Sequence, residues 1–392
     1  MSQFDTLYDR RGTGSVKYDL MEYEGRPADT LPLWVADMDF PAPECVGEAL
    51  KNLAQPGIFG YSFPEEDYKQ AVAGWFGRRF GWTPDPDWLV ETPGVVFALC
   101  TAVKAFTQPG DGVMCLLPVY PHFFEAAIDN GRRPVYGHLK QGPEGRYEID
   151  FEELEQLLDQ EQPKLFILCS PHNPVGRVWS REELERLGRL CFDRGILVVA
   201  DEIHCDFTYP DHPHTPFLSL GPEFEQNAIA CTAPSKTFNL AGLQCSNIFI
   251  PNPQLRKAFE RELAAQGMSG NNTPGRVACQ AVYEQGEPWL EELLVYLRGN
   301  YEFLRDFVAR ELPQLKVFPL EGTYLAWVDA RGLGLDKAGL EDLLRNKARV
   351  WLSDGAGYGQ DGEGFWRFNL ACPRKTLAAA LERIRDAVES LS

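Results

Sequence analysis

A lysine stands just beyond a short apolar run near the middle of the sequence. Ala228-Ile229-Ala230 has the character of the end of a buried strand, and a small polar stretch containing Ser235 and Lys236 follows it. An ammonium group is costly to bury, so partial burial lowers the pKa of a lysine and frees its amine as a nucleophile. The alternative is a lysine whose stem is buried at the strand end and whose charge reaches solvent.

Polar clusters that follow two other apolar runs favour the nucleophile. The run from 164 to 169 leads to Asn173, and the run from 196 to 200 leads to Asp201 and His204. Unbroken apolar runs of this length are typical of the central strands of a parallel sheet, whose carboxyl ends meet at one edge. We therefore expect these polar side chains to converge with the lysine.

The pattern around these clusters predicts the fold class. Strands and helices alternate from about 88 to 250, as in an α/β fold with an open, mostly parallel sheet flanked by helices. The helix expected over 181–194 begins after Ser180 and has Glu183 at the position of a capping box. After 250 the composition changes, and a strongly periodic helix over 288–311 leads into a smaller domain of α+β type.

The length of 392 residues is too great for one ordinary core, so two domains are expected. We predict a large domain over 46–287 and a small C-terminal domain over 288–392. The N-terminal segment, 1–45, is expected to associate with the small domain and to be irregular and extended, apart from an apolar strand within 31–41. A polar loop is expected over 268–275.

The composition is typical of a globular enzyme. Hydrophobic residues make up 44% and charged residues 24%, and 38 basic against 57 acidic residues give a net charge of −19. Because no basic residues cluster, a nucleic acid is not an expected partner. No apolar run approaches membrane-spanning length and the N-terminus carries no signal-peptide pattern, so no membrane association is expected. Ten scattered cysteines favour a reducing cytoplasm.

The converging groups match what pyridoxal 5'-phosphate (PLP) requires of a protein. The cofactor needs a lysine for a Schiff base and a carboxylate, here Asp201, that keeps its pyridine nitrogen protonated. Asn173 and His204 are candidate donors to the ring phenolate. Tyr120, which follows the strand expected over 112–117, can stack on the ring.

The phosphate of the cofactor requires an anion site. A glycine at a helix entrance lets free amides approach an anion, and the helix dipole favours negative charge there. Gly94, Val95 and Val96 stand at such an entrance, after the strand expected over 88–92, and Ser235 can add a hydroxyl. A plain strand–turn–helix connection would look the same, so this signal is weak alone.

Two other interpretations of the same residues fit less well. Residues 201–204 spell the DExH box of helicases, but no phosphate loop of the GxxxxGK[ST] type precedes it, and the chain is acidic. His204, Cys205, His212 and His214 lie close in sequence, but their spacing fits no familiar zinc pattern. No metal site is therefore predicted.

The motifs together resemble a known family. Residues 171–176 (PHNPVG), 201–204 (DEIH) and 235–243 (SKTFNLAGL) are similar to those of fold-type I PLP enzymes of the aspartate aminotransferase superfamily. Residues 35–40 and 369–373 extend the resemblance to the MalY/PatB group of carbon–sulfur β-lyases, the cystathionine β-lyase type. The resemblance runs nearly from end to end and identifies the large domain as the PLP-binding one.

The resemblance implies roles for individual residues. Lys236 corresponds to the Schiff-base lysine that also moves the Cα proton, and Asp201 to the pyridinium partner. Asn173 and His204 correspond to the phenolate donors. Arg367, between Trp366 and Phe368, corresponds to the arginine that binds the substrate α-carboxylate; a surface salt bridge is its alternative. Asn173 and Ala36 are the other expected substrate contacts.

The resemblance also implies a homodimer with a shared active site. Tyr61 corresponds to a tyrosine lent to the neighbouring subunit's phosphate, and Tyr61 or Tyr120 is expected to assist catalysis. One position departs from many aminotransferases, which carry a phosphate-binding arginine eight residues after the lysine. That position is Gln244 here, so the sequence leaves open how the phosphate charge is balanced.

The expected reaction is elimination of a thiol from the β-carbon of cystathionine or a related cysteine S-conjugate, giving pyruvate and ammonia. The alternatives are an aminotransferase of the same superfamily and a protein of this fold that acts mainly by binding a regulatory protein. The sequence alone does not choose the preferred thioether.

Overall fold

The computed structural model describes residues 2–142, 145–268 and 270–391, and its largest element is an eight-stranded sheet. The strand order is β2-β9-β8-β7-β6-β3-β4-β5. The strands are β2 (Leu89–Thr92), β3 (Gly112–Leu117), β4 (Arg133–Gln141), β5 (Tyr147–Ile149), β6 (Leu165–Cys169), β7 (Leu197–Asp201), β8 (Ala228–Thr232) and β9 (Ser246–Phe249). β8, β7, β6, β3 and β4 pair in parallel, whereas β9 and β5 pair antiparallel with their neighbours.

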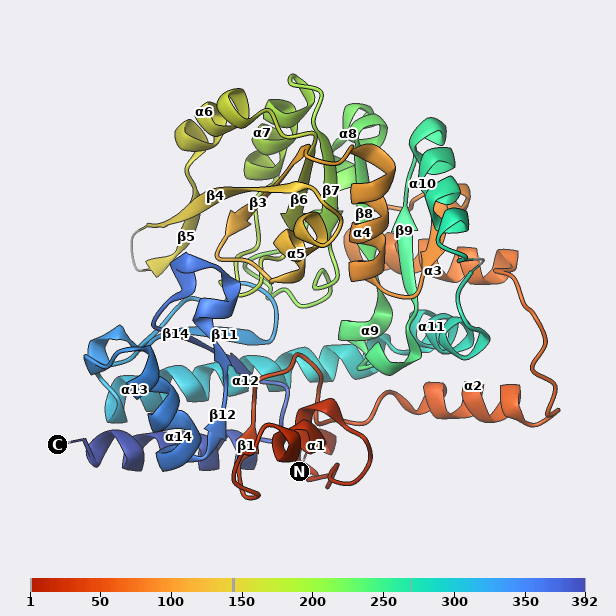
Figure 1. Ribbon diagram of the computed structural model, residues 1–392. Helices are drawn as coiled ribbons and strands as arrows, with labels where there is room; N and C mark the ends of the chain where they lie inside the picture. Colours follow the sequence, from red (N-terminus) through yellow and green to blue (C-terminus); the bar gives the residue numbers. More distant parts are fainter. Residues whose placement is uncertain (1, 143–144, 269, 392) are drawn as a thin grey trace.

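Helices cover both faces of this sheet, as the alternation of strands and helices predicts (Figure 1). The side chains of β3 alternate between the two layers. Val113 and Cys115 pack with α4 (Val95–Phe106), α5 (His122–Ile128) and α10 (Pro253–Ala265), while Met114 and Leu116 pack on the face of α3 (Glu66–Phe80), α6 (Phe151–Glu161) and α7 (Arg181–Phe192). The predicted α/β fold class is confirmed.

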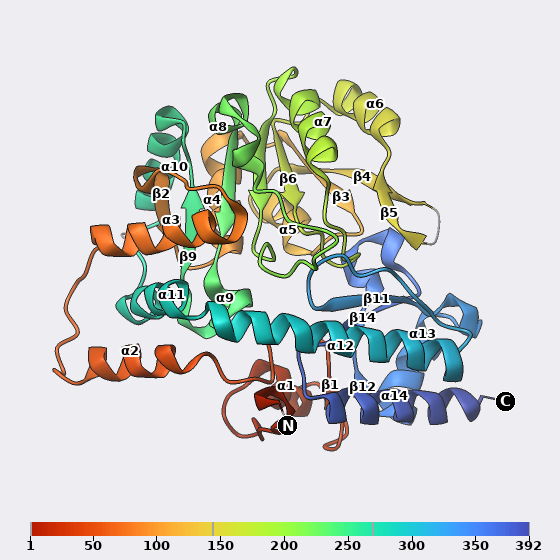
Figure 2. The ribbon, with the colours of Figure 1, turned by 180° about the vertical axis from the view of Figure 1, so that it is seen from behind.

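A second sheet and core lie in the C-terminal part of the chain. The four-stranded antiparallel sheet has the order β10 (Lys316–Val317), β11 (Leu325–Asp329), β14 (Phe365–Asn369) and β13 (Ser353–Asp354). Its core includes α13 (Lys337–Asp342) and α14 (Arg374–Glu389). The long helix α12 (Glu287–Glu311) joins the two parts of the molecule (Figure 2), because its early leucines pack in the first core and its later residues, from Tyr301 on, in the second.

The N-terminal segment returns to the C-terminal part. β1 (Leu31–Pro32) pairs in parallel with β12 (Val350–Trp351). We retain the division into 1–45, 46–287 and 288–392 as a proposal, which this pairing and the two cores support. None of the helices over the described residues combines the length and apolarity needed to cross a membrane.

Two sequence-based expectations for the N-terminal segment are wrong. Residues 16–23 form a helix, α1, because Asp19 accepts hydrogen bonds from the amides of Gly12, Gly14 and Ser15 and so organises the turn before it. The expected strand within 31–41 shrinks to two residues. The Leu33 backbone still bonds to the backbone of Trp351 and Asn369, but from Trp34 on the backbone carbonyls accept hydrogen bonds from side chains, such as that of Asn369 to the Val35 oxygen.

The expected loop over 268–275 is also partly wrong; residue 269 lies outside the described part of the chain. Helix α11 (Thr273–Gln285) begins within it, because the Asn272 side chain caps the helix by accepting a hydrogen bond from the Gly275 amide at 2.7 Å. Polar residues that looked like a loop are thus the start of a helix. Pro274, in the first turn, needs no hydrogen-bond partner for its nitrogen.

Candidate functional site

A cavity of about 480 Å³ lies where the carboxyl ends of the large sheet's parallel strands face β14 and the N-terminal segment. Its lining includes eleven of the twelve site residues predicted from the sequence. They are Ala36, Gly94, Val95, Val96, Tyr120, Asn173, Asp201, His204, Ser235, Lys236 and Arg367. The twelfth, Tyr61, lies elsewhere.

Lys236 is presented by the short helix α9 (Pro234–Thr237), directly after β8. Its Nζ donates a hydrogen bond to the carbonyl oxygen of Ala36 at 2.8 Å. Burial, with the nearby charge of Arg367, lowers the pKa of the Lys236 ammonium to about 8, while Asp37 and Asp201 act in the opposite direction. A fraction of the amine is therefore neutral, and nucleophilic, near neutral pH.

Asp201 is the last residue of β7 and is only 6% exposed. One carboxylate oxygen accepts a hydrogen bond from the Ile203 amide at 3.0 Å, and no ion pair to Asp201 is found among the described residues. Burial raises the pKa of this carboxyl to about 7, although the Ile203 bond and Lys236 oppose that shift. A buried carboxylate of this kind is stabilised by a cation placed against it.

His204 lies three residues beyond Asp201 in the sequence and is also buried. Burial lowers the pKa of His204 well below its usual value, and the charges of Lys236 and Arg367 add to the effect. Its Nδ1 has no hydrogen-bond partner among the described residues. The imidazole is therefore neutral, and neither of its ring nitrogens forms a hydrogen bond with the described residues, which leaves one donor and one acceptor for a bound molecule.

Arg367 in β14 is 4% exposed, and its hydrogen-bond partners are all neutral. Its Nη2 donates to the Trp34 carbonyl oxygen at 2.8 Å and to Ser353 Oγ at 3.1 Å, and its Nη1 donates to Asn173 Oδ1 at 3.1 Å. Its Nε has no partner in the described part of the chain. A buried guanidinium without a carboxylate is the arrangement expected of an anion-binding residue.

The orientation of the Asn173 amide follows from this contact. A guanidinium group has donors only, so Asn173 must turn its oxygen toward Arg367. The NH₂ group of Asn173 is then left as a donor for other groups in the cavity. The backbone carbonyl oxygen of Asn173 accepts a hydrogen bond from the backbone N–H of Tyr120 at 3.1 Å. This bond joins the loop after β6 to the loop after β3.

The remaining lining offers an aromatic ring and neutral donors. Burial raises the pKa of Tyr120 to about 12, with Arg367 opposing the shift, so this phenol stays protonated at neutral pH. Gly94 caps α4 without a side chain, and Gly94, Val95 and Val96 line the cavity with Ser235 and Gln244. Free amides at a helix start and hydroxyls suit a phosphate group.

Tyr61 is fully exposed and does not line this chain's own cavity. Its loop is anchored by Ser62, whose Oγ lies 2.7 Å from Thr273 Oγ1 and accepts a hydrogen bond from Arg276 Nη1 at 2.7 Å. Sequence reasoning missed three residues that surround Arg367, namely Trp34, Ser353 and Tyr358. None of them follows an apolar strand of the large sheet. The pattern of an apolar run followed by a polar residue, which predicted the other site residues, therefore does not identify them.

Known proteins with similar sequences and structures cover the whole chain. Residues 28–384 match the family aminotransferase class I and II. The Bacillus subtilis protein named cystathionine beta-lyase PatB is 45% identical over 385 residues, 98% of this chain and 99% of its own. Protein MalY of Escherichia coli is 32% identical over the full length of both.

A solved structure gives the same result. The crystal structure of cystalysin from Treponema denticola, which contains a pyridoxal 5'-phosphate cofactor, is 37% identical, has a TM-score of 0.96 and covers 99% of each chain. These matches confirm the family resemblance that the motifs predicted. The chain belongs to the class I and II aminotransferase family.

Proposed function

We propose that this protein is a PLP-dependent carbon–sulfur β-lyase that cleaves cystathionine or related cysteine S-conjugates to a thiol, pyruvate and ammonia. The observation that carries the proposal is the joint presence, in one cavity, of a low-pKa lysine, an unpaired buried carboxylate and an unpaired buried guanidinium. The relatives named cystathionine beta-lyase support the choice of reaction within the family.

The residues present fit PLP. Asp201 lacks a cation, which the protonated pyridine nitrogen would supply, and Asn173 and His204 each have a nitrogen free to approach the phenolate. The start of α4, at Gly94, Val95 and Val96, and the Ser235 hydroxyl would hold the phosphate. Bound PLP supplies one thing the protein lacks, a conjugated ring that accepts the negative charge left when a proton leaves Cα.

The residues of the chain supply binding, orientation and proton transfer. Arg367 would bind the substrate α-carboxylate with the help of Asn173, and so fix the direction of the Cα–H bond. Lys236 Nζ would take up the Cα proton, which requires the neutral amine that its low pKa provides. A thiolate is a good leaving group, so the protonated phenol of Tyr120 needs to assist only weakly.

We also propose a homodimer with shared active sites. The loop 57–63 exposes a run of large apolar side chains, Ile58 at 79%, Phe59 at 72%, Tyr61 at 109% and Phe63 at 71%. Such a patch is typical of a surface covered by another protein. Because Tyr61 is fully exposed, its hydroxyl can reach the phosphate site of a second copy of the chain. That site contains the uncharged Gln244, so an additional hydrogen-bond donor would help to hold the phosphate.

A complementation experiment tests the shared site. Lys236→Ala and Tyr61→Phe variants would each have low activity, whereas a mixed dimer contains one site with both residues intact. Random exchange of subunits should restore about a quarter of the parent activity. Failure of the mixture to exceed the summed activities of the two variants would contradict this dimer.

We further propose a cytoplasmic location, supported by ten free cysteines.

The reaction itself is tested by incubating the protein and PLP with L-cystathionine and measuring pyruvate and free thiol together. Equal amounts of both products, formed without a keto acid, are expected. Turnover that depends on an added keto acid and releases no thiol would instead identify an aminotransferase.

A further inference from the structure

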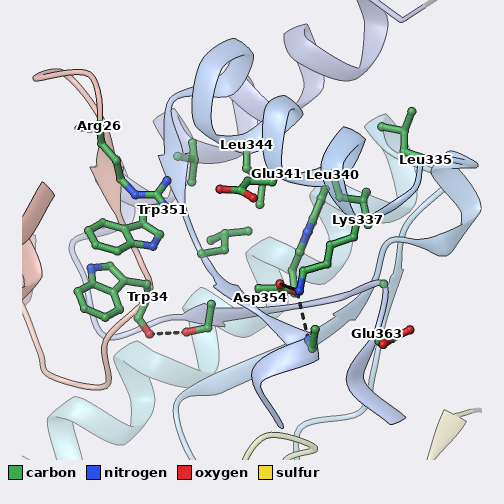
Figure 3. Close-up of a pocket in the computed structure, with 16 residues that line it drawn as sticks. Arg26, Trp34, Leu335, Lys337, Leu340, Glu341, Leu344, Trp351, Asp354 and Glu363 are labelled. Atoms are coloured by element: carbon green, nitrogen blue, oxygen red, sulfur yellow. Dashed lines mark hydrogen bonds and ion pairs between the residues drawn. The ribbon is translucent and has the colours of Figure 1, made fainter. Parts of the chain in front are cut away.

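A second, larger hollow of about 900 Å³ lies on the small-domain side of the molecule (Figure 3). We call it the Trp351 groove. Helix α13, strands β12 and β13, and the N-terminal residues Arg26 and Trp34 border it. None of its residues was predicted as a site residue from the sequence, and the proposed β-elimination does not require it.

One wall of the Trp351 groove is a stack of three flat groups. The rings of Trp34 and Trp351 are stacked with centroids 4.1 Å apart and planes at 11°. The Arg26 guanidinium lies over Trp351 at 4.1 Å from its centroid, and Figure 3 shows Trp351 between Arg26 and Trp34. A guanidinium stacked in this way keeps the N–H donors at its edge free for a planar anion.

The Arg26 side chain has no hydrogen bond or ion pair with any residue that the structure describes, and its Nε is buried without a partner. Burial lowers the pKa of Arg26 and the neighbouring Arg345 adds to this effect, while Glu341 and Glu24 oppose it without forming an ion pair with Arg26 among the described residues. Most arginines of this chain are paired with carboxylates; Arg345, for example, lies 3.5 Å from Glu341. Arg26 therefore has unused capacity to bind an anion, as Arg367 does in the cavity.

The rest of the Trp351 groove is apolar at its floor and charged at its rim. Leu340, Leu344 and Trp366 are buried side chains of the floor. The rim carries three exposed acidic residues, Glu341, Asp354 and Glu363, against one lysine, Lys337 (Figure 3). This excess of negative charge disfavours a molecule with several negative charges. A ligand with one carboxylate and an aromatic or branched aliphatic body matches both features.

The Trp351 groove shares a wall with the catalytic cavity. Trp34 and Ser353 line both spaces. Within this wall, the Ser353 hydroxyl donates to the Trp34 carbonyl oxygen at 2.8 Å, and both oxygens accept hydrogen bonds from Arg367. A ligand that shifts the Trp34 ring would therefore also shift the Trp34 carbonyl and the Ser353 hydroxyl. These are two of the groups that hold Arg367, the proposed binder of the substrate carboxylate.

We propose that the Trp351 groove is a second ligand site, that it binds a small apolar monocarboxylate through Arg26 and Trp351, and that its occupancy is coupled to Arg367. The carboxylate has two possible sources, the far end of a long S-substituent or a separate small molecule. The first source rests on the proposed β-lyase function, whereas the second does not.

Calorimetric titration of the PLP-loaded protein with 4-phenylbutyrate tests the site. We expect binding that Arg26→Gln weakens by at least about tenfold, because a charge-assisted pair is lost. Arg310→Gln is the matched control, since Arg310 also lies over an aromatic ring, Phe307, but is paired with Glu311. It should bind like the parent. Equal binding by Arg26→Gln would overturn the proposal.

A further comparison needs no variant and covers the case in which Arg26→Gln folds poorly. The uncharged 4-phenylbutanamide should bind the parent about tenfold more weakly than the acid. Saturating L-alanine, whose carboxylate would bind Arg367, should shift the phenylbutyrate affinity to a new constant value, because the two sites are coupled, and should not displace phenylbutyrate. Displacement by L-alanine, or equal affinity for acid and amide, would place the ligand outside the groove and overturn the proposal.

Kinetics with two substrates distinguish the sources. If the groove receives the far end of the substrate, Arg26→Gln should lower kcat/KM at least about tenfold for S-(4-carboxybutyl)-L-cysteine and leave S-methyl-L-cysteine unaffected. If a separate molecule binds, phenylbutyrate should change KM for S-methyl-L-cysteine in the parent but not in Arg26→Gln. If neither of these two effects is observed, the proposed coupling between the groove and Arg367 is wrong. A protein without β-lyase activity fails the proposed function, yet the titrations still decide whether the site exists.

Discussion

Two buried arginines in this protein have opposite surroundings. Arg177 is 1% exposed and Arg367 is 4% exposed, and each lies against an aromatic ring, Trp179 and Tyr358 respectively. Arg177 pairs with two carboxylates, Glu321 at 2.8 Å and Glu183 at 2.9 Å. Arg367 has none. Burying a charge is costly unless it is paired, so Arg177 is satisfied by the fold itself, whereas Arg367 is proposed to be completed by a ligand.

The same contrast extends to the regions around them. The Arg177 cluster joins the loop after β6 to residue Glu321 of the C-terminal part, and Arg146 adds a second cation to Glu321 at 2.5 Å. In the cavity, Asp201, Lys236 and Arg367 are all buried or half-buried without direct ion pairs among the described residues. Changes in the cavity should therefore affect activity, and changes in the cluster should affect stability.

The largest effect is expected for Lys236→Ala. It removes both the proposed nucleophile and the proposed acceptor of the Cα proton, so kcat should fall by about 10⁴-fold or more. Borohydride reduction should no longer attach the cofactor to the protein, as shown by peptide mass analysis. Thermal unfolding of the variant should resemble that of the parent. A variant that retains attached cofactor would show that another lysine carries it.

The converse change is Glu321→Gln, which leaves Arg177 and Arg146 with less negative charge. Breaking a buried pair by removing one partner typically costs about 3–5 kcal/mol, so the unfolding midpoint should fall clearly. Activity per folded molecule should stay close to that of the parent at low temperature. A normal midpoint with reduced activity would reverse the assignment of this region as structural.

Arg367→Lys keeps the charge of the cavity and loses the two-pronged geometry. A charge-assisted hydrogen bond is worth roughly 1.5–3 kcal/mol, so kcat/KM for cystathionine should fall about tenfold to a hundredfold. An amine substrate without the carboxylate provides the control, and it should be poor for the parent and no worse for the variant. Parent-like kinetics on cystathionine would mean that the carboxylate is bound elsewhere.

The sequence predicts the cavity well where local signals exist. The apolar runs of β6, β7 and β8 each lead directly to a polar residue, and parallel strands bring their carboxyl ends together whatever the rest of the chain does. Asn173, Asp201 and Lys236 could therefore be found without the structure, and their family motifs agree.

The partners of Arg367 could not be found in this way. Trp34 and Ser353 are 319 residues apart and meet where β1 pairs with β12, a two-residue contact with no local signature. The Arg26–Trp351–Trp34 stack depends on the same pairing. Helix α1 was missed for a related reason, since Lys17 on it is fully buried against Asp37 and Asp39, contacts that periodicity cannot reveal.

The last prediction concerns the stability of Asp201→Asn, measured on protein from which the cofactor has been removed. Burial raises the pKa of Asp201 to about 7 in the folded protein, above its ordinary value of 3.8. Between about pH 4 and 7 the folded state therefore holds a proton that the unfolded state has released, and the parent loses stability as pH rises through this range.

The Asp201→Asn variant cannot titrate at this position, so it does not lose stability between about pH 4 and 7 for this reason. A shift of three pKa units, which already includes the opposing effect of the Ile203 hydrogen bond, corresponds to an upper limit of about 4 kcal/mol. The variant should match the parent near pH 4 and unfold at a higher temperature at pH 8, although its β-elimination activity is lost. With PLP bound, the order at pH 8 should reverse, because the pyridinium then pairs with the parent carboxylate. If the cofactor-free variant is less stable than the parent at pH 8, Asp201 is already satisfied by the fold, as Arg177 is, and the contrast between the two regions fails at this residue.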